Sequence, residues 1–333
     1  MSVLPAASAA VSPWRAALRG VRRNKAAILS VIALALVILS SAGAPLYADH
    51  VAKTGPLTNH LSDYIELDGQ STPVVEYDGV PIGPTYTGKY FLGADGNGRD
   101  VMVRLLYGGR NSLLIGLSAT LLSLLVGGAL GILAGYARGA TDGLISRALD
   151  VLWAFPVILL GSALGAATAL GGIQLGPFAL SGGSIWLIAF VVGLLNIVYI
   201  ARPIRGAVLS VGEQAYVEAA RAQGAGTFRI MRNEIFPNVS GTLLALFPII
   251  LTQAIALEAA LSFLGAGVKQ PKPSWGTMLD DGIDTLLAAP HLTLVPGGVL
   301  VVTILALTVL SDVVRDALDP RGTKTAETLV GAR

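Results

Sequence analysis

Six long apolar stretches constrain this chain more than any other feature of its sequence. A helix that crosses the hydrocarbon layer of a membrane needs about 20 mainly apolar residues. Stretches of this kind lie at residues 26–46, 112–135, 150–170, 184–203, 241–264 and 292–312. The whole chain is 53% hydrophobic and 13% charged, with a mean hydropathy of +0.67, so it is too apolar for an ordinary soluble protein. We therefore predict an all-α polytopic membrane protein with six transmembrane helices.

The basic residues predict how these helices are oriented. Lysine and arginine favour the cytoplasmic side, and here they gather before the first stretch, between the second and third, and between the fourth and fifth. They are Arg15, Arg19, Arg22, Arg23, Lys25, Arg138, Arg147, Arg202, Arg205, Arg221, Arg229 and Arg232. We expect the tails 1–25 and 313–333 to be cytoplasmic and the segment 47–110 to be external. Because the cations flank predicted helices and the net charge is only +2, nucleic-acid binding is not indicated.

The first apolar stretch has a second interpretation. A basic leader, an apolar core and the sequence Ala42-Gly43-Ala44 are also features of a cleaved signal peptide. The core here is longer than the roughly 7 to 15 residues of such signals, and its leader is long as well. Cleavage would also upset the topology that the basic residues predict. We therefore expect the first helix to be retained.

The external segment is long enough to form a small subdomain. Strand-forming residues at 73–77 and 80–82 flank Asp78-Gly79, a dipeptide that favours a tight turn. This pattern predicts a β-hairpin centred on that turn.

No metal site is predicted. Asp95, Asn97 and Asp100 could suggest a calcium loop, but Arg99 occupies the fifth position, where an oxygen ligand is needed. The three histidines, His50, His60 and His291, do not follow a zinc-binding spacing. The sequence contains no cysteine, which excludes disulfides, thiolate catalysis and cysteine-ligated metals.

A polar insert lies between the fourth and fifth apolar stretches. It reads EAARAQGAGTFRIMRNEIFP from Glu218 to Pro237. Good helix formers open it, a glycine pair at Gly224 and Gly226 interrupts it, and Thr227 is expected to cap a second short helix. Pro237 either stops the segment or opens the next helix. The insert is therefore predicted to be two short helices joined at a bend.

This insert resembles the EAA motif of ABC importer permeases, in which Glu-Ala-Ala is followed four residues later by glycine and closes on an apolar-Pro pair. The matching residues are Glu218, Ala219, Ala220, Gly224, Phe236 and Pro237. The resemblance implies a cytoplasmic segment, 213–238, that inserts into a groove on an ATPase subunit, with Arg221 and Phe228 as further contacts. One departure is that the usual isoleucine falls on Glu234, while Ile235 follows one residue later.

Three more stretches are similar to the C-type permease subunits of dipeptide and oligopeptide importers. They read FLGADGNGRDVMVRLLYGGRNSLLIG from Phe91, SFLGAGVKQPKPSWGTML from Ser262 and LSDVVRDALDPR from Leu310. The resemblance implies that residues 111–312 form a type I ABC permease domain in a bacterial or archaeal cytoplasmic membrane.

The resemblance also implies partners. They are a second, B-type permease, two cytoplasmic ATPase subunits, an external solute-binding protein and the peptide substrate, with the lipid bilayer around them. The sequence lacks the GxxxxGK[ST] pattern of a P-loop, so ATP and Mg would be bound by the ATPase subunits and no cofactor by this chain. The chain itself is not expected to be an enzyme.

Glu258 is the one acidic residue well inside a predicted span, and such a group needs water or a partner. We expect it toward the external end of its helix. It is a candidate contact on the translocation pathway or for a partner's arginine; alternatively, it hydrogen-bonds to the short loop after Gly265.

Small residues and prolines mark other intramembrane positions. Glycines recur every fourth residue, which favours close helix packing over a direct role in lining the peptide path. They are Gly127, Gly131 and Gly135, then Gly161 and Gly165. Pro156 and Pro248 are candidate kinks.

Other functions remain open at this stage. Permeases of this group also serve nickel, antimicrobial peptides and some sugars, so the cargo is not fixed by the sequence. An ion-coupled secondary transporter would need coupling residues near the membrane midplane, and only Glu258 qualifies. A membrane enzyme is a third class, but no catalytic grouping stands out.

Overall fold

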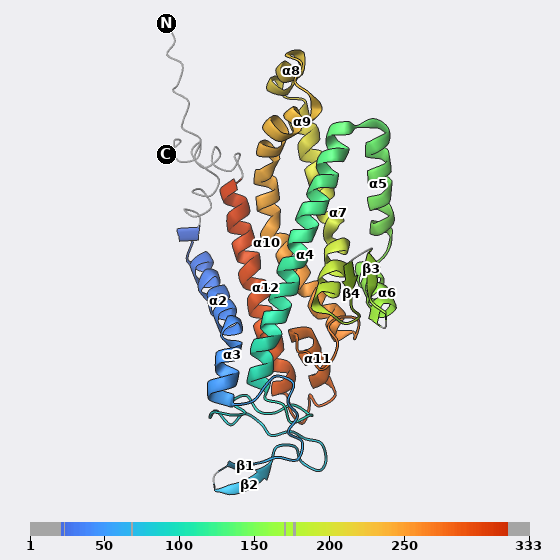
Figure 1. Ribbon diagram of the computed structural model, residues 1–333. Coiled ribbons are helices and arrows are strands. Elements are labelled where there is room, and N and C mark those ends of the chain that lie inside the picture. The colour runs from blue at the N-terminus through green and yellow to red at the C-terminus, as the bar shows by residue number, and fades with distance from the viewer. Residues whose placement is uncertain (1–20, 23, 68, 170, 176–177, 319–333) are drawn as a thin grey trace.

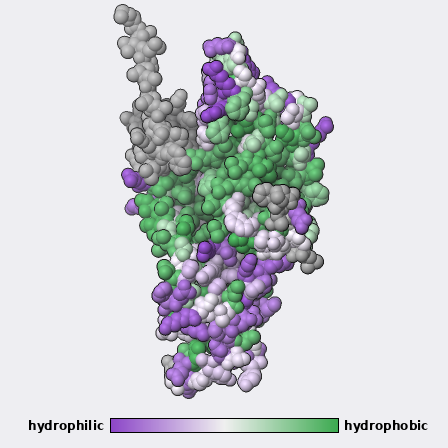
Figure 2. All heavy atoms as spheres, viewed as in Figure 1, coloured by the Kyte–Doolittle hydropathy of each residue, from purple (hydrophilic) through white to green (hydrophobic). Residues whose placement is uncertain are grey.

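The computed structural model describes residues 21–22, 24–67, 69–169, 171–175 and 178–318. Within these residues, five long apolar helices run side by side (Figure 1). They are α2 (Lys25–Ala42), α4 (Val101–Ala137), α7 (Ile185–Gly212), α10 (Phe236–Phe263) and α12 (His291–Leu318). Figure 2 shows a hydrophobic band around the middle of the molecule and hydrophilic residues toward both ends. The predicted all-α polytopic architecture is confirmed.

The third predicted span differs from the expectation of one helix over 150–170. It is a bent pair, α5 (Gly139–Ala154) followed by α6 (Val157–Ala169), with an angle of 88° between the two helices. The break falls at Pro156, whose ring removes a backbone N–H and disfavours a helical conformation at Phe155. The structure therefore has six apolar spans only if this bent pair counts as one.

Helix α4 is longer than the predicted span 112–135, with 37 residues. It begins at Val101 because Asp100 caps it, with Oδ1 accepting a hydrogen bond of 3.0 Å from the backbone N–H of Val103. At the start of the chain, α2 is followed by the short helix α3 (Ala44–Tyr47) and a π-helical turn (Ala48–Ala52).

Glycines allow α4 and α7 to touch along their length. A Cβ added at Gly131 would lie 2.6 Å from the carbonyl oxygen of Ala201. The glycines one turn earlier and one turn later, Gly127 and Gly135, would each place a Cβ 2.8 Å from a carbonyl oxygen of α7. Only hydrogen fits at these positions, so the packing role predicted for this glycine series is confirmed.

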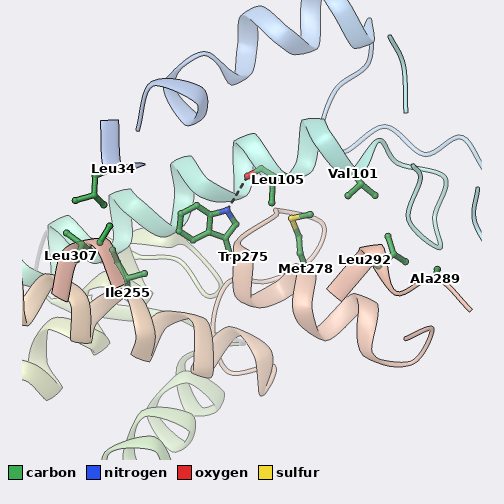
Figure 3. Packing of buried hydrophobic residues seen from close by; sticks show 10 residues of the cluster. Leu34, Val101, Leu105, Ile255, Trp275, Met278, Ala289, Leu292 and Leu307 are labelled. Carbon is green, nitrogen blue, oxygen red and sulfur yellow. Dashed lines mark hydrogen bonds between the residues drawn. The ribbon is translucent and has the colours of Figure 1, made fainter. Parts of the chain in front are cut away.

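A buried tryptophan anchors one end of the helix bundle (Figure 3). Trp275 opens α11 (Trp275–Ile283) and is 1% exposed. Its indole Nε1 donates a hydrogen bond of 3.3 Å to the carbonyl oxygen of Leu105 in α4. Apolar residues of α2, α10 and α12 pack into the same cluster, including Leu34, Ile255 and Leu307. This cluster joins the N-terminal and C-terminal helices.

The segment between α2 and α4 extends the molecule beyond this cluster (Figure 1). Its hairpin consists of β1 (Tyr64–Leu67) and β2 (Gln70–Pro73), which pair antiparallel. The chain turns back at Asp78-Gly79 as predicted, but the two predicted strands are reduced to a single antiparallel bridge, between Val75 and Pro81. The backbone N–H groups of Val74 and Val80, which a longer ladder would use, donate instead to the carbonyl oxygen of Asp63 and to the carboxylate of Asp78. A second short antiparallel pair, β3 (Ile173–Leu175) and β4 (Phe178–Leu180), lies between α6 and α7.

Candidate functional site

The polar insert folds into a compact projection at the end of the bundle opposite the β1–β2 hairpin (Figure 1). It consists of α8 (Ala215–Ala222), α9 (Thr227–Ile230) and a π-helical turn (Met231–Ile235) that runs into α10. We refer to residues 215–235 as the insert. Two short helices joined at a bend were predicted, and the structure has them.

The glycine bend is a helix-ending motif with defined hydrogen bonds. The N–H of Gly224 donates to the carbonyl of Arg221 at 2.9 Å, and that of Ala225 donates to the carbonyl of Ala220 at 3.0 Å. Gly224 has φ +80, the left-handed conformation that this motif requires. The spacing between Glu-Ala-Ala and glycine is thus the length of the last helical turn plus its cap.

Three apolar residues anchor the insert to the bundle. Val217, Ile230 and Ile235 are 0%, 1% and 0% exposed, and they pack into one cluster with Ile200 and Ile204 of α7. Full burial of such side chains stabilises by about 1.5–3 kcal/mol each, so the insert is held against α7 rather than tethered loosely.

The π-helical turn explains why the sequence departs from the expected register at its isoleucine. A π turn accommodates one extra residue relative to an α-helix. Ile235, not Glu234, consequently points into the buried cluster, while Glu234 is only partly covered. The apolar anchor is therefore kept one residue later than expected.

Ala220 is partly buried against this cluster, and the other predicted contact residues of the two short helices face outward. Glu218, Ala219 and Arg221 are exposed on α8, and the guanidinium of Arg221 lies 5.6 Å from the ring centre of Tyr136 at the end of α4. Phe228 is 74% exposed on α9. An exposed phenylalanine beside exposed charges is suited to contact another protein.

Two expectations about the ends of these helices have different outcomes. Thr227 was expected to cap α9, but it is the first helical residue; Gly226 occupies the cap position without a side-chain bond. Pro237 opens α10, which begins at Phe236. Phe236 is half exposed and lines an apolar groove of about 480 Å³ between α4 and α10, together with Leu125 and Phe247.

Glu258 lies toward the opposite end of α10 and is completely buried. Its carboxylate accepts hydrogen bonds from the hydroxyls of Ser262 at 2.7 Å and Ser112 at 2.8 Å. The two hydroxyls in turn accept from the backbone N–H groups of Val268 and Trp275. Through Ser262, Glu258 thus holds the loop after Gly265, which is the alternative to a contact with substrate or with a partner's arginine. In the part of the chain that the structure describes, the Glu258 carboxylate is not exposed at the surface.

A second group of charges near the hairpin end escaped the sequence analysis. The Asp95 carboxylate lies 2.7 Å from Arg99 Nε and 3.1 Å from Arg104 Nε, and Asp281 lies 3.0 Å from Arg104 Nη2. Arg104 is 1% exposed. Burial raises the pKa of Asp281, although the neighbouring Arg104 and Arg99 act in the opposite direction. An arginine inside an apolar helix was the signal for such a network.

The network fastens three distant segments together. The guanidinium of Arg104 also donates to the carbonyl oxygens of Pro56 and Pro271, at 3.3 and 3.2 Å. Arg99 donates to the side chain of Gln270 at 3.3 Å. With two carboxylates and two guanidinium groups, the network is balanced in charge and binds the loop before α11 to α4. Among the described residues, no group of three His, Asp or Glu side chains is placed to hold a metal ion.

Comparisons with known proteins were made for sequence and for structure. Residues 127–324 match the family described as binding-protein-dependent transport system inner membrane component, and residues 12–63 match the N-terminal TM domain of oligopeptide transport permease C. The dipeptide transport system permease protein DppC of Alkalihalophilus pseudofirmus is 34% identical over 94% of this chain and 91% of its own length. The oligopeptide transport system permease protein OppC of Haemophilus influenzae is 33% identical over 93% and 89%.

Among solved structures, a chain of the inward-facing MetNI methionine ABC transporter is similar to this one. The TM-score is 0.51 with 18% identity, covering 66% of this chain and 97% of the other. At that identity the likeness concerns the fold alone.

Proposed function

Since this chain belongs to the family of binding-protein-dependent transport system inner membrane components, we propose that it forms half of the translocation pathway of an ATP-driven importer and is driven through the insert 215–235. It is a permease subunit of the cytoplasmic membrane. The importer's cargo is proposed to be dipeptides or oligopeptides, which the names of the similar proteins specify for those proteins.

The observation that carries the coupling proposal is the insert itself. It is anchored by three buried residues, exposes Glu218 and Phe228, and continues without a break into α10. A docked ATPase that displaced the insert would therefore pull directly on that helix. Because α10 has 28 residues, or about 42 Å of length, the displacement would reach most of the way across the membrane.

The end of α10 farther from the insert is held in place by hydrogen bonds to neighbouring segments, so a displacement of the insert would move the near end of the helix relative to the far end. Glu258 and Ser262 tie it to α4 and to the loop before α11. The half of α10 nearer the insert carries the apolar groove that begins at Phe236. We propose that this groove faces the second permease, so that ATP-driven closure of two ATPase subunits changes the interface where the pathway lies.

Partners and cofactors follow from the same proposal. In this proposal ATP and Mg are bound by the two ATPase subunits on the cytoplasmic side, where the distribution of basic residues predicts the insert and both chain termini to lie. A solute-binding protein delivers the cargo from outside. Nickel or another small solute is the alternative cargo, because a binding protein, and not the permease alone, selects what is delivered.

An ion-coupled secondary transporter has less support. Glu258, the acidic residue on which that mechanism would depend, has both carboxylate oxygens occupied by serine hydroxyls.

The experiment is uptake by the assembled importer carrying Glu218→Arg or Gly224→Asp. We expect uptake to be lost while membrane insertion and the amount of permease stay normal. Asp312→Arg is the matched control, since it reverses an exposed charge on α12 outside the insert. Normal transport by both insert variants would refute the coupling role.

A further inference from the structure

The segment between α2 and α4 ends in a tip whose surface is unlike the rest of the molecule. We define the distal tip as residues 61–82, which include the β1–β2 hairpin and the Asp78-Gly79 turn. In Figure 1 it lies at the far end of the molecule from α8. Its sequence contains five carboxylate side chains and no lysine, arginine or histidine. The tip is therefore strongly acidic in a chain whose net charge is +2, and four of these carboxylates, those of Asp63, Glu66, Glu76 and Asp78, belong to described residues.

The distal tip is a folded surface. The N–H of Val74 donates to the carbonyl of Asp63 at 2.9 Å, and that of Ile82 donates to the carbonyl of Val74 at 2.9 Å. Val74 is 0% exposed and packs with Ile82 and Tyr90 in a small core of its own. The backbone around this core consequently has a defined conformation.

A hollow of about 450 Å³ opens on this surface. Its lining includes Leu61, Asp63, Tyr64, Val75, Glu76 and Tyr77. Tyr64 is 60% exposed and Tyr77 is 105% exposed, so neither ring is used to stabilise the fold. Asp63 contacts His60 and Lys89, whereas none of the ion pairs among the described residues involves Glu76. The hollow combines an available carboxylate with two available aromatic rings.

Carboxylates beside phenol rings suit one type of ligand group. A guanidinium or ammonium ion gains an ion pair from the carboxylate and a cation–π contact from the ring. Tyrosine is also enriched where proteins bind one another, and aromatic residues supply much of the affinity there. The exposed Leu61 extends the apolar part of the surface beside the hollow.

We propose that the distal tip is a docking surface for a folded extracytoplasmic protein that inserts a lysine or arginine side chain between Glu76 and Tyr77. This inference rests on the proposed function, in which the partner is the solute-binding protein on which the family depends. Docking at the tip places that protein on the outer face, at the opposite end of the permease from the ATPase-driven insert. A partner with a basic face is complementary to the acidic tip, and this complementarity also accelerates its approach.

The test measures binding of this protein to the assembled permease–ATPase complex in lipid nanodiscs. The probe is the binding protein that co-purifies with a tagged copy of the chain from its native membrane. Glu76→Lys and Tyr77→Ala alter exposed side chains, so both variants are expected to fold. Asp49→Lys is the matched control, because it makes the same charge reversal at an exposed position of the same segment outside the tip.

We expect Glu76→Lys to weaken binding at least about tenfold, since it places like charges together. Tyr77→Ala should weaken it as well, Asp49→Lys should stay within about twofold, and added salt should weaken the wild-type interaction by screening. ATP hydrolysis without binding protein should be the same in all variants. Unchanged binding by Glu76→Lys, or equal weakening by Asp49→Lys, would overturn the proposal.

Photo-crosslinking provides an independent measurement of the partner. With benzoylphenylalanine in place of Tyr77, the expected adduct joins the binding protein through a segment containing lysine or arginine. An adduct only with the second permease or with lipid would overturn the docking proposal while leaving the importer assignment intact. A wild-type complex that hydrolyses ATP but from which no binding protein co-purifies would instead refute the proposed function, and the docking proposal with it.

Discussion

Two glycines of the insert lie two residues apart and should respond differently to the same substitution. Gly224 has φ +80, while Gly226 has φ −67 and ψ 157. A Cβ added at either position meets nothing within 4 Å. Any difference between Gly224→Ser and Gly226→Ser therefore arises from backbone conformation and not from steric contact with neighbours.

The magnitudes follow from these angles. A side chain in the left-handed conformation costs roughly 1–2 kcal/mol. That cost favours opening of the bend, and it corresponds to a shift of about 5–30-fold in the ratio of closed to open insert. Gly226 is the cap residue of α9 and has an ordinary φ, so serine there should be neutral or stabilise by a few tenths of a kcal/mol.

Amide hydrogen exchange of the purified permease measures this difference directly. In Gly224→Ser, the amides of α8 should exchange about 5–30 times faster than in the wild type, since local opening is what exposes them. In Gly226→Ser they should exchange at the wild-type rate. Equal protection in the two variants would show that the left-handed bend is not what holds the insert in shape.

Three further pairs of variants test the rest of the account by unfolding in detergent, followed through tryptophan fluorescence. Gly131→Ala should lower the free energy of unfolding by about 1–3 kcal/mol, because its Cβ meets a carbonyl of α7, whereas Gly128→Ala should be near neutral, because its Cβ meets only the tip of a leucine. Asp281→Ala should cost about 3 kcal/mol by leaving buried guanidinium groups short of a partner, and Asp280→Ala, at an exposed neighbouring position, should cost less than about 0.5 kcal/mol. Glu258→Ala should lower the free energy of unfolding by more than Glu258→Gln does, because alanine leaves two buried hydroxyls without an acceptor, each costing about 1–3 kcal/mol. An equal effect of the two variants in any of these pairs would contradict the contact assigned to it.

Local composition predicted the features that depend on neighbouring residues. The apolar stretches became helices because roughly 20 apolar residues in a row have no better way to satisfy their backbone in a membrane. The insert was recognised because helix formers and glycines alternate within a few residues. The Gly224 bend depends on its own φ and on hydrogen bonds within a single turn, which sequence spacing can indicate.

Features that depend on distant residues were missed. The start of α4 at Val101 was not foreseen, because Arg104 looks unfavourable in an apolar helix until its partner Asp281 is known. Those residues are 177 positions apart. The hairpin was placed at Asp78-Gly79 although Asp68-Gly69 is an equal turn signal. What distinguishes the two turns is where the donors go: near Asp78-Gly79, the N–H of Val74 bonds to the distant Asp63 and that of Val80 bonds to Asp78, so neither extends a ladder.

The central claim, that the insert docks on an ATPase subunit, is tested most directly by crosslinking through Phe228. Because the natural sequence has no cysteine, Phe228→Cys supplies the only thiol of the chain, at a position that is 74% exposed. In the complex purified from its native membrane, a maleimide reagent that carries a short photoreactive diazirine should join this thiol to an ATPase subunit on illumination, with a yield that changes when ATP is added. A modified but uncrosslinked thiol, in a complex that still contains both ATPase subunits, would contradict the account.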